Sequence, residues 1–567
     1  MSFQDALAQF QRGDGAGAEL TLGVLLAREP KNGQALQLLA AVRHGRGDVS
    51  GALEAIDRAA ALAPSDPGLA FNRAAMLSTL GRHRECLHAA AIVLRAAPRD
   101  AEALLLRGVA QAGLGDHTAA LASFEASRLD RADAHAHRAG SLNALDRFAE
   151  ALAAADCALA RAAQNPDAHY QRGVALMGLE RAADALVSFD AALTRRGEVA
   201  IRAARANALA SVGRLDEALA DIDVALAQAP YKADYLVRRA YVLNAMDRPE
   251  EALVAYDRVL AQRPDDVDAA YGKADVLLSL GDFEQGLEFY EARLRLKSAK
   301  PMARSSAPLW RGEDLKGKTL LLIAEQGFGD LFQFCRFAPV LAARGARVII
   351  QERPSTLALL GSLQGVDSVV SIREPSPAAD FHAPIAGLMR TLGVRADSIP
   401  ASIPYLHAKP ECVAAWRARL PLSPQRRIGI AWSGVATHAA QALRSLDEKA
   451  LRQLVDADAD FVSLQLEQSA VLTAAGVPQF GEALRDFADL AALIETLDLV
   501  ISIDTGVAHL AGALGKPVWI MLAHRADWRW MRNREDTPWY PQARLFRQSA
   551  RGDWAGVIAR VHAALQE

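Results

Sequence analysis

The chain has 567 residues, of which 51% are hydrophobic and 23% are charged, a composition typical of folded globular proteins. Its 64 basic residues nearly balance 67 acidic ones, so no overall charge attracts nucleic acid or an anionic membrane. A single hydrophobic core seldom grows beyond about 300 residues, and at least two domains are therefore expected.

The N-terminal sequence MSFQDALAQFQRGDG contains Asp5 and lacks the basic and apolar regions of a secretory signal. The four cysteines, Cys86, Cys157, Cys335 and Cys412, are far apart, which suggests reduced thiols and argues against a zinc site. No later stretch has the length of a membrane span. These features predict a soluble, cytoplasmic protein that binds no nucleic acid.

From the N-terminus to about residue 298 the sequence repeats with a period of 34 residues. One residue in each repeat is expected to mark a turn between two helices: Gly47, Gly81, Gly115, Asp146, Glu180, Gly213, Asp247 and Gly281. Five residues after most of these marks stands a small residue: Ala52, Ala120, Ala151, Ala185, Ala218, Ala252 and Gly286. Nine residues after most of them stands a larger one: Ile56, Phe124, Phe189, Ile222, Tyr256 and Tyr290.

Prolines recur where the second helix of a repeat should end, because proline cannot continue a helix. They are Pro30, Pro64, Pro98, Pro166, Pro230 and Pro264. The whole pattern resembles the tetratricopeptide repeat, in eight or nine copies over residues 1–298. The resemblance implies an α-solenoid whose concave face holds a peptide or protein; alternatively, the helices support dimerisation or stiffen the rest of the chain.

A stretch rich in Pro and Ser, KSAKPMARSSAPLW, predicts a linker over residues 299–317. Beyond it, KTLLLIAE is a short apolar strand, followed by a turn with Gly327 and Gly329 and the helical run LFQFCRFAPVLAARG. The strands RVIIQE and SVVSI complete a first Rossmann-like half over residues 318–410. RRIGIAWSG, FVSLQ, LDLVISIDTG and KPVWIML predict a second half over residues 411–567 that ends in a helix.

Two open parallel sheets bind ligands at the carboxyl ends of their strands. The turn that ends in Asp330, residues 432–445 and residues 504–506 should therefore line one cleft. Thr505 or Asp504 can cap the helix after the strand, and Gly506 allows close approach of a ligand. Free backbone N–H groups at that helix start favour a phosphate; the alternative is a simple capped helix.

Three motifs occur in a characteristic order: GFGD at 327–330, WSG at 432–434 with a downstream basic residue, and DTGVAH at 504–509. This order resembles the ADP-heptose:lipopolysaccharide heptosyltransferase family, which implies the two-Rossmann glycosyltransferase fold called GT-B over residues 318–548. EQGFGDLFQFCRFAP, DWRW and PWYPQARLFRQ bring the chain closer to bacterial proteins in which tetratricopeptide repeats precede such a domain. Among these are soluble flagellin glycosyltransferases, whose repeats recruit flagellin.

The resemblance implies roles for individual residues. Asp330 would be the base that deprotonates the acceptor hydroxyl; its alternative role is an N-cap. Arg444, assisted by Ser445, would bind the leaving phosphate in the place of a family lysine. His509 and His438 could reach a phosphate or a sugar hydroxyl, although packed core histidines are the alternative.

The segment 432–445 departs from the family, because it reads WSGVATHAAQALRS where relatives usually read WSGNPxHxNDRNRS. Trp528 and Trp530 could stack on a base or sugar, but such residues more often belong to a core. Asp456, Asp458 and Asp460 form a DxDxD run at the amino end of a strand, the wrong edge for a metal site. We therefore expect transfer without a metal ion or other cofactor.

Together these features predict a protein O-glycosyltransferase that moves a sugar from a CMP- or ADP-linked nucleotide-sugar to Ser or Thr of a protein held by the repeats. If the acceptor is flagellin, the donor would carry a nonulosonic acid such as pseudaminic acid. One alternative is a heptosyltransferase that acts on lipopolysaccharide core with ADP-heptose. The other is an inactive adaptor, to which the altered donor segment would point.

Overall fold

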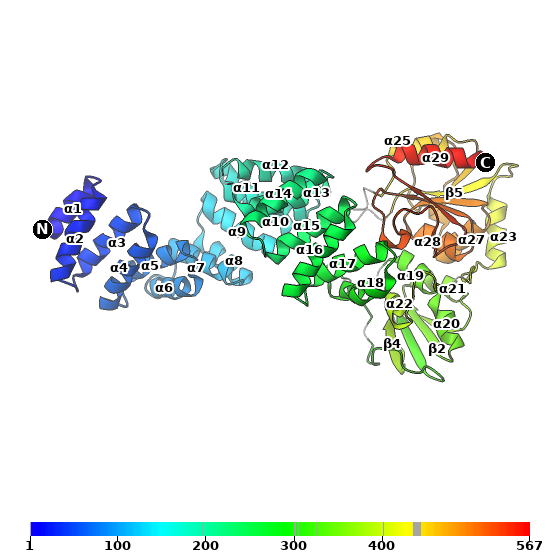
Figure 1. Cartoon of the computed structure of the whole chain (residues 1–567), viewed down its shortest axis with the longest axis horizontal. Coiled ribbons are helices and arrows are strands. Elements are labelled where there is room, and N and C mark those ends of the chain that lie inside the picture. Colours follow the sequence, from blue (N-terminus) through cyan, green and yellow to red (C-terminus); the bar gives the residue numbers. More distant parts are fainter. Residues whose placement is uncertain are drawn as a thin grey trace. The chain divides into compact units, whose positions relative to one another are not determined.

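The computed structural model describes residues 2–195, 197–299, 302–303, 305–325, 327–400, 402–434 and 444–567. The chain divides into two compact units, Met1–Val212 and Gly213–Glu567 (Figure 1). Over the described ranges, none of the helices combines the length and the apolar character needed to cross a bilayer.

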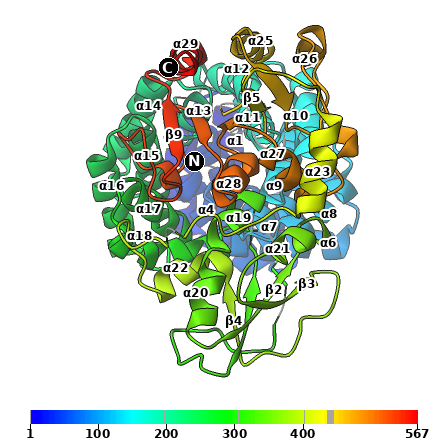
Figure 2. The same cartoon turned by 90° about the vertical axis from the view of Figure 1, so that its right-hand side faces the viewer.

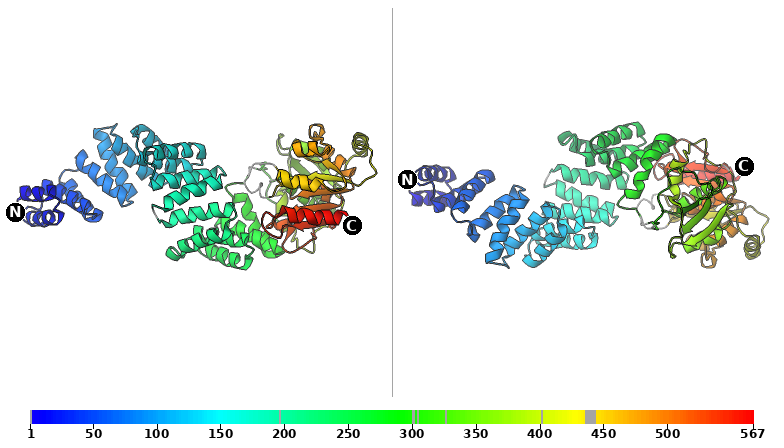
Figure 3. Two further views of the ribbon diagram at one scale, coloured as in Figure 1. Left: turned by 90° about the horizontal axis from the view of Figure 1, so that it is seen from above. Right: turned by 90° about the horizontal axis from the view of Figure 1, so that it is seen from below.

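The first unit contains thirteen helices among its described residues, and Figure 3 shows them as successive antiparallel pairs. They are α1 (Phe3–Gln11), α2 (Gly15–Arg28), α3 (Gly33–Gly45), α4 (Val49–Leu62), α5 (Pro67–Thr79), α6 (His83–Ala96), α7 (Ala101–Gly113), α8 (His117–Ser127), α9 (Ala132–Ala144), α10 (Phe148–Arg161), α11 (Pro166–Gly178), α12 (Ala182–Leu193) and α13 (Val199–Ser211). The second unit begins with helices of the same kind: α14 (Leu215–Gln228), α15 (Ala233–Ala245), α16 (Pro249–Gln262), α17 (Val267–Ser279) and α18 (Phe283–Tyr290).

The eight predicted turn residues all adopt the left-handed conformation, with φ between 57° and 87°. This explains why glycine recurs at these marks, since glycine alone adopts positive φ without a steric penalty. Gly13, with φ 83°, has the same role between α1 and α2, so the described residues contain nine helix pairs. The repeat prediction is confirmed.

The two predicted packing positions are also confirmed, because all members named above are buried. In three repeats the aromatic residue lies directly against a glycine of a neighbouring helix. A Cβ on Gly108 would come within 2.4 Å of Phe124, and one on Gly173 within 2.5 Å of Phe189. The proline prediction holds except at Pro166, which begins α11 instead of following the end of α10. Proline is tolerated there because the first helical N–H needs no partner within the helix.

The α/β part contains two parallel sheets. The first has the order β3-β2-β1-β4 and the second the order β6-β5-β7-β8-β9. The strands of the first are β1 (Thr319–Ile323), β2 (Arg347–Glu352), β3 (Val366–Ser371) and β4 (Phe381–Pro384). Those of the second are β5 (Arg427–Ala431), β6 (Asp460–Ser463), β7 (Leu499–Ile503), β8 (Val518–Leu522) and β9 (Ala543–Arg547). The predicted GT-B arrangement of two Rossmann-like halves agrees with these sheets.

Helices connect the strands of both halves. In the first half they are η1 (Glu291–Arg295) before the sheet, then α19 (Phe328–Phe334), α20 (Phe337–Ala343), α21 (Pro354–Leu360), η2 (Ile385–Gly387), α22 (Leu388–Thr391) and α23 (Pro410–Arg419). In the second half they are α25 (Glu448–Val455), α26 (Ala470–Ala474), η3 (Gly481–Ala483), α27 (Phe487–Glu495), α28 (Gly506–Ala513), η4 (Trp528–Trp530) and α29 (Trp554–Leu565).

The helix predicted from 331 to 345 is interrupted in the structure, where α19 ends at Phe334 and α20 begins at Phe337. Pro339 accounts for the break. Its ring has no N–H to donate to the carbonyl of Cys335 and would collide with that carbonyl in a continuous helix.

One hydrophobic core joins the last repeat helices to both Rossmann-like halves. It contains Phe283 and Tyr290 of α18 together with Leu320 of β1 and Val500 of β7. Trp528 and Trp539 also belong to it. The last repeats of the second unit are thus packed as part of the α/β region, and they help to position the segment around η4.

Candidate functional site

The strand orders place a topological switch point at the carboxyl end of each sheet. In the first sheet the chain passes from β1 through β2 to β3 and then returns to pair β4 with the other side of β1. In the second it passes from β5 to β6 and returns to pair β7 with β5. Ligands of open α/β sheets bind at such points, and Asp330 follows β1 while Asp504 follows β7.

Helices α19 and α28, which follow β1 and β7, lie side by side between the two sheets (Figure 2). A Cβ on Gly329 would lie 2.8 Å from Cδ2 of His509, and one on Gly506 would lie 3.6 Å from the backbone nitrogen of Gly329. The glycines therefore bring the two helices, and with them the two predicted motifs, into direct contact.

Asp330 lies in the first turn of α19, whose N-cap is Gly327, so the N-cap alternative for Asp330 is wrong. Its Oδ1 accepts a hydrogen bond of 2.7 Å from Nη2 of Arg529, and its side chain is 19% exposed. Burial raises the pKa of Asp330 above its usual value, while Arg529 and the backbone N–H of Gly327 oppose that rise. The carboxylate is thus held by Arg529 and remains partly exposed.

Arg529 is almost fully buried, and its guanidinium donates hydrogen bonds to several partners. Its Nε donates to Oε1 of Gln333 at 2.7 Å, and its Nη1 donates to Oδ1 of Asp527 at 2.8 Å. Its Nη2 also lies 3.4 Å from the hydroxyl of Tyr290 in α18. Burial opposes the charge of Arg529, but Asp330 and Asp527 outweigh it and raise its pKa well above the ordinary value.

Arg444 lies near two carboxylates on the second half. Its Nη1 is 3.5 Å from Oδ2 of Asp504. Burial raises the pKa of Asp504, and the charge of Asp527 adds to this, whereas Arg444 acts against it. Burial also opposes ionisation of Asp527, but Arg529 and Arg444 together lower its pKa below the ordinary value. The Arg444 side chain is 39% exposed, so part of its guanidinium is accessible to solvent.

Thr505 is the N-cap of α28, as predicted, and its Oγ1 accepts a hydrogen bond of 3.3 Å from the backbone N–H of Val507. It also lies 3.0 Å from the hydroxyl of Ser502. The helix therefore begins at the carboxyl end of β7. Its remaining N–H groups and its dipole suit an anion.

His509 is packed as a core histidine in the structure, which is the alternative that the sequence left open. Its ring stacks on Trp530 with centroids 5.1 Å apart, and its Nδ1 is 3.0 Å from the hydroxyl of Tyr540. Burial, followed by the charge of Arg529, lowers the pKa of His509 to about 3. The ring is thus neutral at physiological pH and brings no charge to a phosphate.

A second buried ion pair joins the last repeat to the end of β1. Glu325 accepts hydrogen bonds from Nε and Nη2 of Arg293 at 2.7 and 2.9 Å, and one of 3.1 Å from the backbone N–H of Ala386. Arg293 belongs to η1, directly after α18. The pair thus links the segment after α18 to the end of β1, two residues before the GFGD turn.

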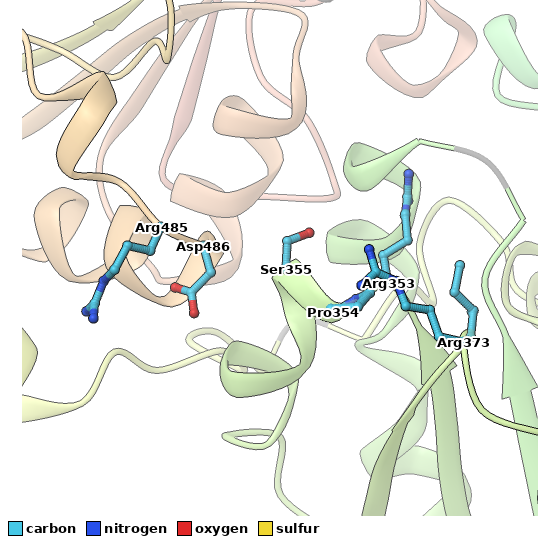
Figure 4. Close-up of a pocket in the computed structure, with 7 residues that line it drawn as sticks. Arg353, Pro354, Ser355, Arg373, Arg485 and Asp486 are labelled. Atoms are coloured by element: carbon cyan, nitrogen blue, oxygen red, sulfur yellow. The ribbon is translucent and has the colours of Figure 1, made fainter.

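A pocket of about 610 Å³ opens at the same edge of the first sheet. Figure 4 shows Arg353, Ser355 and Arg373 on one side, facing Arg485 and Asp486 of the second half on the other. The guanidinium of Arg353 lies 3.7 Å from the ring centroid of Phe328, so the pocket adjoins the start of α19. The pocket wall carries both positively and negatively charged side chains, which suit a hydroxylated ligand.

The remaining predicted residues have different positions. Ser445 lies half-buried beside Arg444, and His438 lies outside the described residues. Trp528 and Trp530 are buried, so the core interpretation is confirmed.

The DxDxD run precedes or begins β6, at the amino end of that strand. Across the described part of the chain, no group of three or more His, Cys, Asp or Glu side chains is arranged to hold a metal ion.

Sequence reasoning missed Arg529, Asp527 and Glu325. The segment DWRW was noted only for its tryptophans and for its resemblance to relatives. The sequence contains one sign of their role, the charged pair Asp527 and Arg529 within a Trp-rich segment. An arginine between two buried tryptophans needs acidic partners, because a buried charge is costly unless it is paired. Which carboxylates these are depends on tertiary structure.

Comparison with known proteins agrees with the two-part organisation. Residues 3–67, 77–137 and 243–299 match models of the tetratricopeptide repeat. Residues 485–542 match the model of glycosyltransferase family 9 (heptosyltransferase). The chain is also similar to Protein FlbA of Caulobacter vibrioides, with 28% identity over 316 residues. That match covers 50% of this chain and 52% of FlbA, so it spans about half the length of this curated relative.

Three solved structures match part of the chain with TM-scores below 0.5. The APC/C hetero-tetramer Cut9-Hcn1 matches with a TM-score of 0.39 and 16% identity, over 48% of this chain and 54% of that one. A tetratricopeptide repeat protein from Parabacteroides merdae matches with a TM-score of 0.31 and 15% identity, over 48% and 95%. YrrB, a TPR protein with an unusual peptide-binding site, matches with a TM-score of 0.27 and 22% identity, over 33% and 98%.

Proposed function

We propose that this chain, in which tetratricopeptide repeats precede a domain of glycosyltransferase family 9, transfers a sugar from a nucleotide-sugar to a hydroxyl group of a protein. The observation that carries the proposal is the contact between α19 and α28. It brings the helix that carries Asp330, at the switch point of one sheet, against the helix that follows Asp504 at the switch point of the other, and Asp504 in turn lies 3.5 Å from Arg444. In the proposed reaction Asp330 is the base for the acceptor, and Arg444 is the cation that binds the leaving phosphate.

In the proposed reaction the acceptor oxygen attacks the anomeric carbon of the donor sugar, and the bond from that carbon to the phosphate oxygen breaks. The proton of the acceptor hydroxyl passes to Asp330 and from there to water. The nucleotide leaves with the electron pair of the broken bond and gains negative charge. Arg444, assisted by Ser445, and the N-terminal turn of α28 stabilise that charge, which removes the need for a metal ion.

The repeats supply the acceptor in this proposal. Tetratricopeptide repeats stack into surfaces that bind peptides and proteins, and nine helix pairs precede the cleft. Flagellin is the proposed acceptor, with Ser or Thr as the modified residue, and the cytoplasm is the proposed compartment. The donor is a CMP- or ADP-linked sugar, with a nonulosonic acid as the first candidate.

The match to family 9 also favours a second acceptor, lipopolysaccharide core, with ADP-heptose as the donor. The two candidates are separated by one panel experiment. The purified full chain is incubated with flagellin or with lipopolysaccharide core, and with CMP-, ADP-, UDP- or GDP-linked sugars. Intact mass of the acceptor and release of the nucleotide are measured.

We expect the mass of flagellin to rise by the mass of the sugar residue with one donor, and not to rise with Asp330→Ala. A mass increase of lipopolysaccharide core alone would establish the second candidate. If neither acceptor changes while flagellin binds to the chain, the α/β domain is an inactive adaptor.

A further inference from the structure

We infer that Arg529 is a positioning residue for Asp330, which it holds by one carboxylate oxygen and connects to the last repeat helix. This inference rests on the proposed function of Asp330 as the base. It adds a residue outside the GFGD, WSG and DTGVAH motifs. It also means that the last repeat helps to position a residue of the proposed active site.

The geometry around Arg529 leaves its guanidinium little freedom. Three of its nitrogens donate to three side chains: Asp330 and Gln333 of α19, and Asp527 before η4. The side chain is 8% exposed, and its charge lies 4.6 Å from the ring centroid of Trp528. Because a planar guanidinium with three fixed bonds cannot rotate, Oδ1 of Asp330 is held in place. This fixes the direction in which Oδ2 points.

The connection to the repeats passes through aromatic residues of α18. Tyr290 contacts Arg529 with its hydroxyl and packs edge-on against Trp528, with ring centroids 5.5 Å apart. Phe283 packs against Trp528 and also against Trp539. Burial raises the pKa of Tyr290 to about 12, so its phenol stays neutral. These contacts hold the backbone around η4 against α18. From this position the side chain of Arg529 reaches Asp330.

Among the described residues, charged and titratable groups of several elements influence Asp330. They are Arg529 and Asp527 from the η4 segment, Arg293 from η1 and Tyr290 from α18, while His509 of α28 packs against the neighbouring Gly329. His509 is neutral at physiological pH, and Arg293 is engaged by Glu325. Removal of the Arg529 guanidinium would leave Asp330 beside the negative charge of Asp527, which raises the pKa of Asp330. Removal of the Asp527 charge would leave Asp330 beside the positive charge of Arg529, which lowers that pKa. The two changes should therefore affect the ionisation of Asp330 in opposite directions.

The test is the pH dependence of kcat/KM for transfer to flagellin, with the nucleotide-sugar that the panel identifies. The acidic limb of this profile reports ionisation of the base in the free enzyme. We expect Arg529→Gln to move the limb to higher pH by about 1 to 3 units, the usual influence of an opposite charge at this distance. Asp527→Asn should move it to lower pH, and Arg529→Lys should place it between wild type and Arg529→Gln.

Arg525→Gln is the matched control, since it removes a guanidinium of the same segment that pairs with Asp275 of α17 and not with Asp330. Its limb should coincide with that of wild type. A uniform loss of rate at every pH in Arg529→Gln, with an unmoved limb, would show that Arg529 only supports the fold. If Arg529→Gln does not fold, Asp527→Asn decides alone, and an unmoved limb in that variant overturns the inference.

The two proposals fail in different ways. Without transfer by wild type the proposed function is wrong, and the inference is wrong with it. When wild type transfers the sugar but neither variant moves the limb, the proposed function stands and only the role of Arg529 is rejected.

Discussion

At the scale of single residues, the contact between Gly329 and His509 determines how closely α19 and α28 approach. A Cβ on Gly329 would lie 2.8 Å from Cδ2 of His509. That ring cannot move aside easily, because Trp530 stacks on it and Tyr540 is hydrogen-bonded to it. A side chain at position 329 must therefore separate the two halves of the site.

We predict that Gly329→Ala lowers the free energy of unfolding of the second unit by about 1 to 3 kcal/mol, the usual cost of overpacking. It should also reduce transfer, since Asp330 would be displaced. Gly506→Ala is the control, because its Cβ would meet no atom closer than 3.6 Å. Urea unfolding of both variants is the measurement. Equal stability of the two would show that the contact is not tight.

His509 gives a prediction about pH. Its pKa is about 3 in the folded protein, below the value of about 6.5 in unfolded chains. The folded state therefore binds the proton less readily, and the stability that neutral His509 contributes is fully present above pH 6.5. It is lost as the pH falls from 6.5 towards 3, by up to about 1.4 kcal/mol per pH unit.

Unfolding free energies of wild type and His509→Gln at pH 7 and pH 5 test this directly. Wild type should lose about 2 kcal/mol more than the variant over this interval, because other titrating groups cancel in the difference. An equal loss in both proteins would show that His509 takes up a proton in the folded state, and the core position described for it would then be wrong.

The limits of sequence reasoning are clearest at this scale. Asp330, Thr505 and Arg444 belong to local motifs, and their neighbourhoods could be predicted from strand ends and helix starts. Arg529 could not, because it is 199 positions away from Asp330 in the chain. The role of His509 was undecided for a similar reason: helical spacing gives its direction, but Trp530 and Tyr540 decide whether it faces ligand or core.

At the scale of elements, the repeats begin their second helices in two ways. Four helices have an aspartate N-cap that accepts from the backbone three residues later: Asp14, Asp48, Asp116 and Asp282. Five begin after an arginine without a side-chain cap, and this arginine pairs with an acidic residue three positions on: Arg82, Arg147, Arg181, Arg214 and Arg248. The first solution satisfies a backbone donor, and the second places negative charge at the helix start.

We predict that Asp48→Ala destabilises α4 by about 1 kcal/mol, the typical cost of a lost N-cap. Amide hydrogen exchange in the first turns of α4 should then accelerate about fivefold. Asp48→Asn keeps an oxygen acceptor and should exchange at nearly the wild-type rate. Equal acceleration in both variants would mean that charge, and not the cap, stabilises this helix.

A further regularity joins neighbouring repeats. An aspartate in the second helix of one repeat pairs with a basic residue 15 or 16 positions later in the first helix of the next. The pairs are Asp57–Arg73, Asp156–Arg172, Asp190–Arg205, Asp223–Arg239 and Asp257–Lys273, with distances from 2.5 to 2.7 Å. The ladder follows the period of the repeats, but the glycine, alanine and aromatic positions that mark a repeat do not predict it.

The same scale shows which strands the sequence could predict. The long apolar strands at the centre of each sheet were placed correctly, because burial on both faces demands continuous hydrophobic runs. Strands β4 and β9 were missed. The first, FHAP, has four residues and ends in proline, and the second, ARLFR, carries two arginines. Both are edge strands, where pairing on one side permits polar residues and proline.

At the scale of the whole chain, the division into compact units falls at 212/213, within the repeat array. Helices α14 to α18 therefore belong to the same unit as the two sheets. Buried residues of α17 and α18 share the core of the two sheets, and the Arg293–Glu325 pair adds a link from the segment after α18 to the end of β1. The repeat pattern in the sequence gives no sign of this, because these repeats have the same marks as those before them.

We predict that a fragment of residues 213–567 is soluble and monodisperse, whereas 299–567 aggregates or unfolds at a much lower temperature. The shorter fragment loses the apolar face of α18 and leaves Glu325 buried without Arg293, a change that typically costs about 3 to 5 kcal/mol. Thermal unfolding and size-exclusion chromatography compare the two. Equal stability would show that α14 to α18 are not needed by the α/β region.

The central claim is that the first repeats select a protein and the Asp330 cleft modifies it. The most direct measurement is the rate of sugar transfer to folded flagellin by the full chain and by residues 213–567, with nucleotide binding measured in parallel. The account predicts equal nucleotide affinity and a rate of transfer at low acceptor concentration that falls roughly a hundredfold in the fragment, because tethering of the acceptor is lost. Equal transfer by the fragment would contradict it.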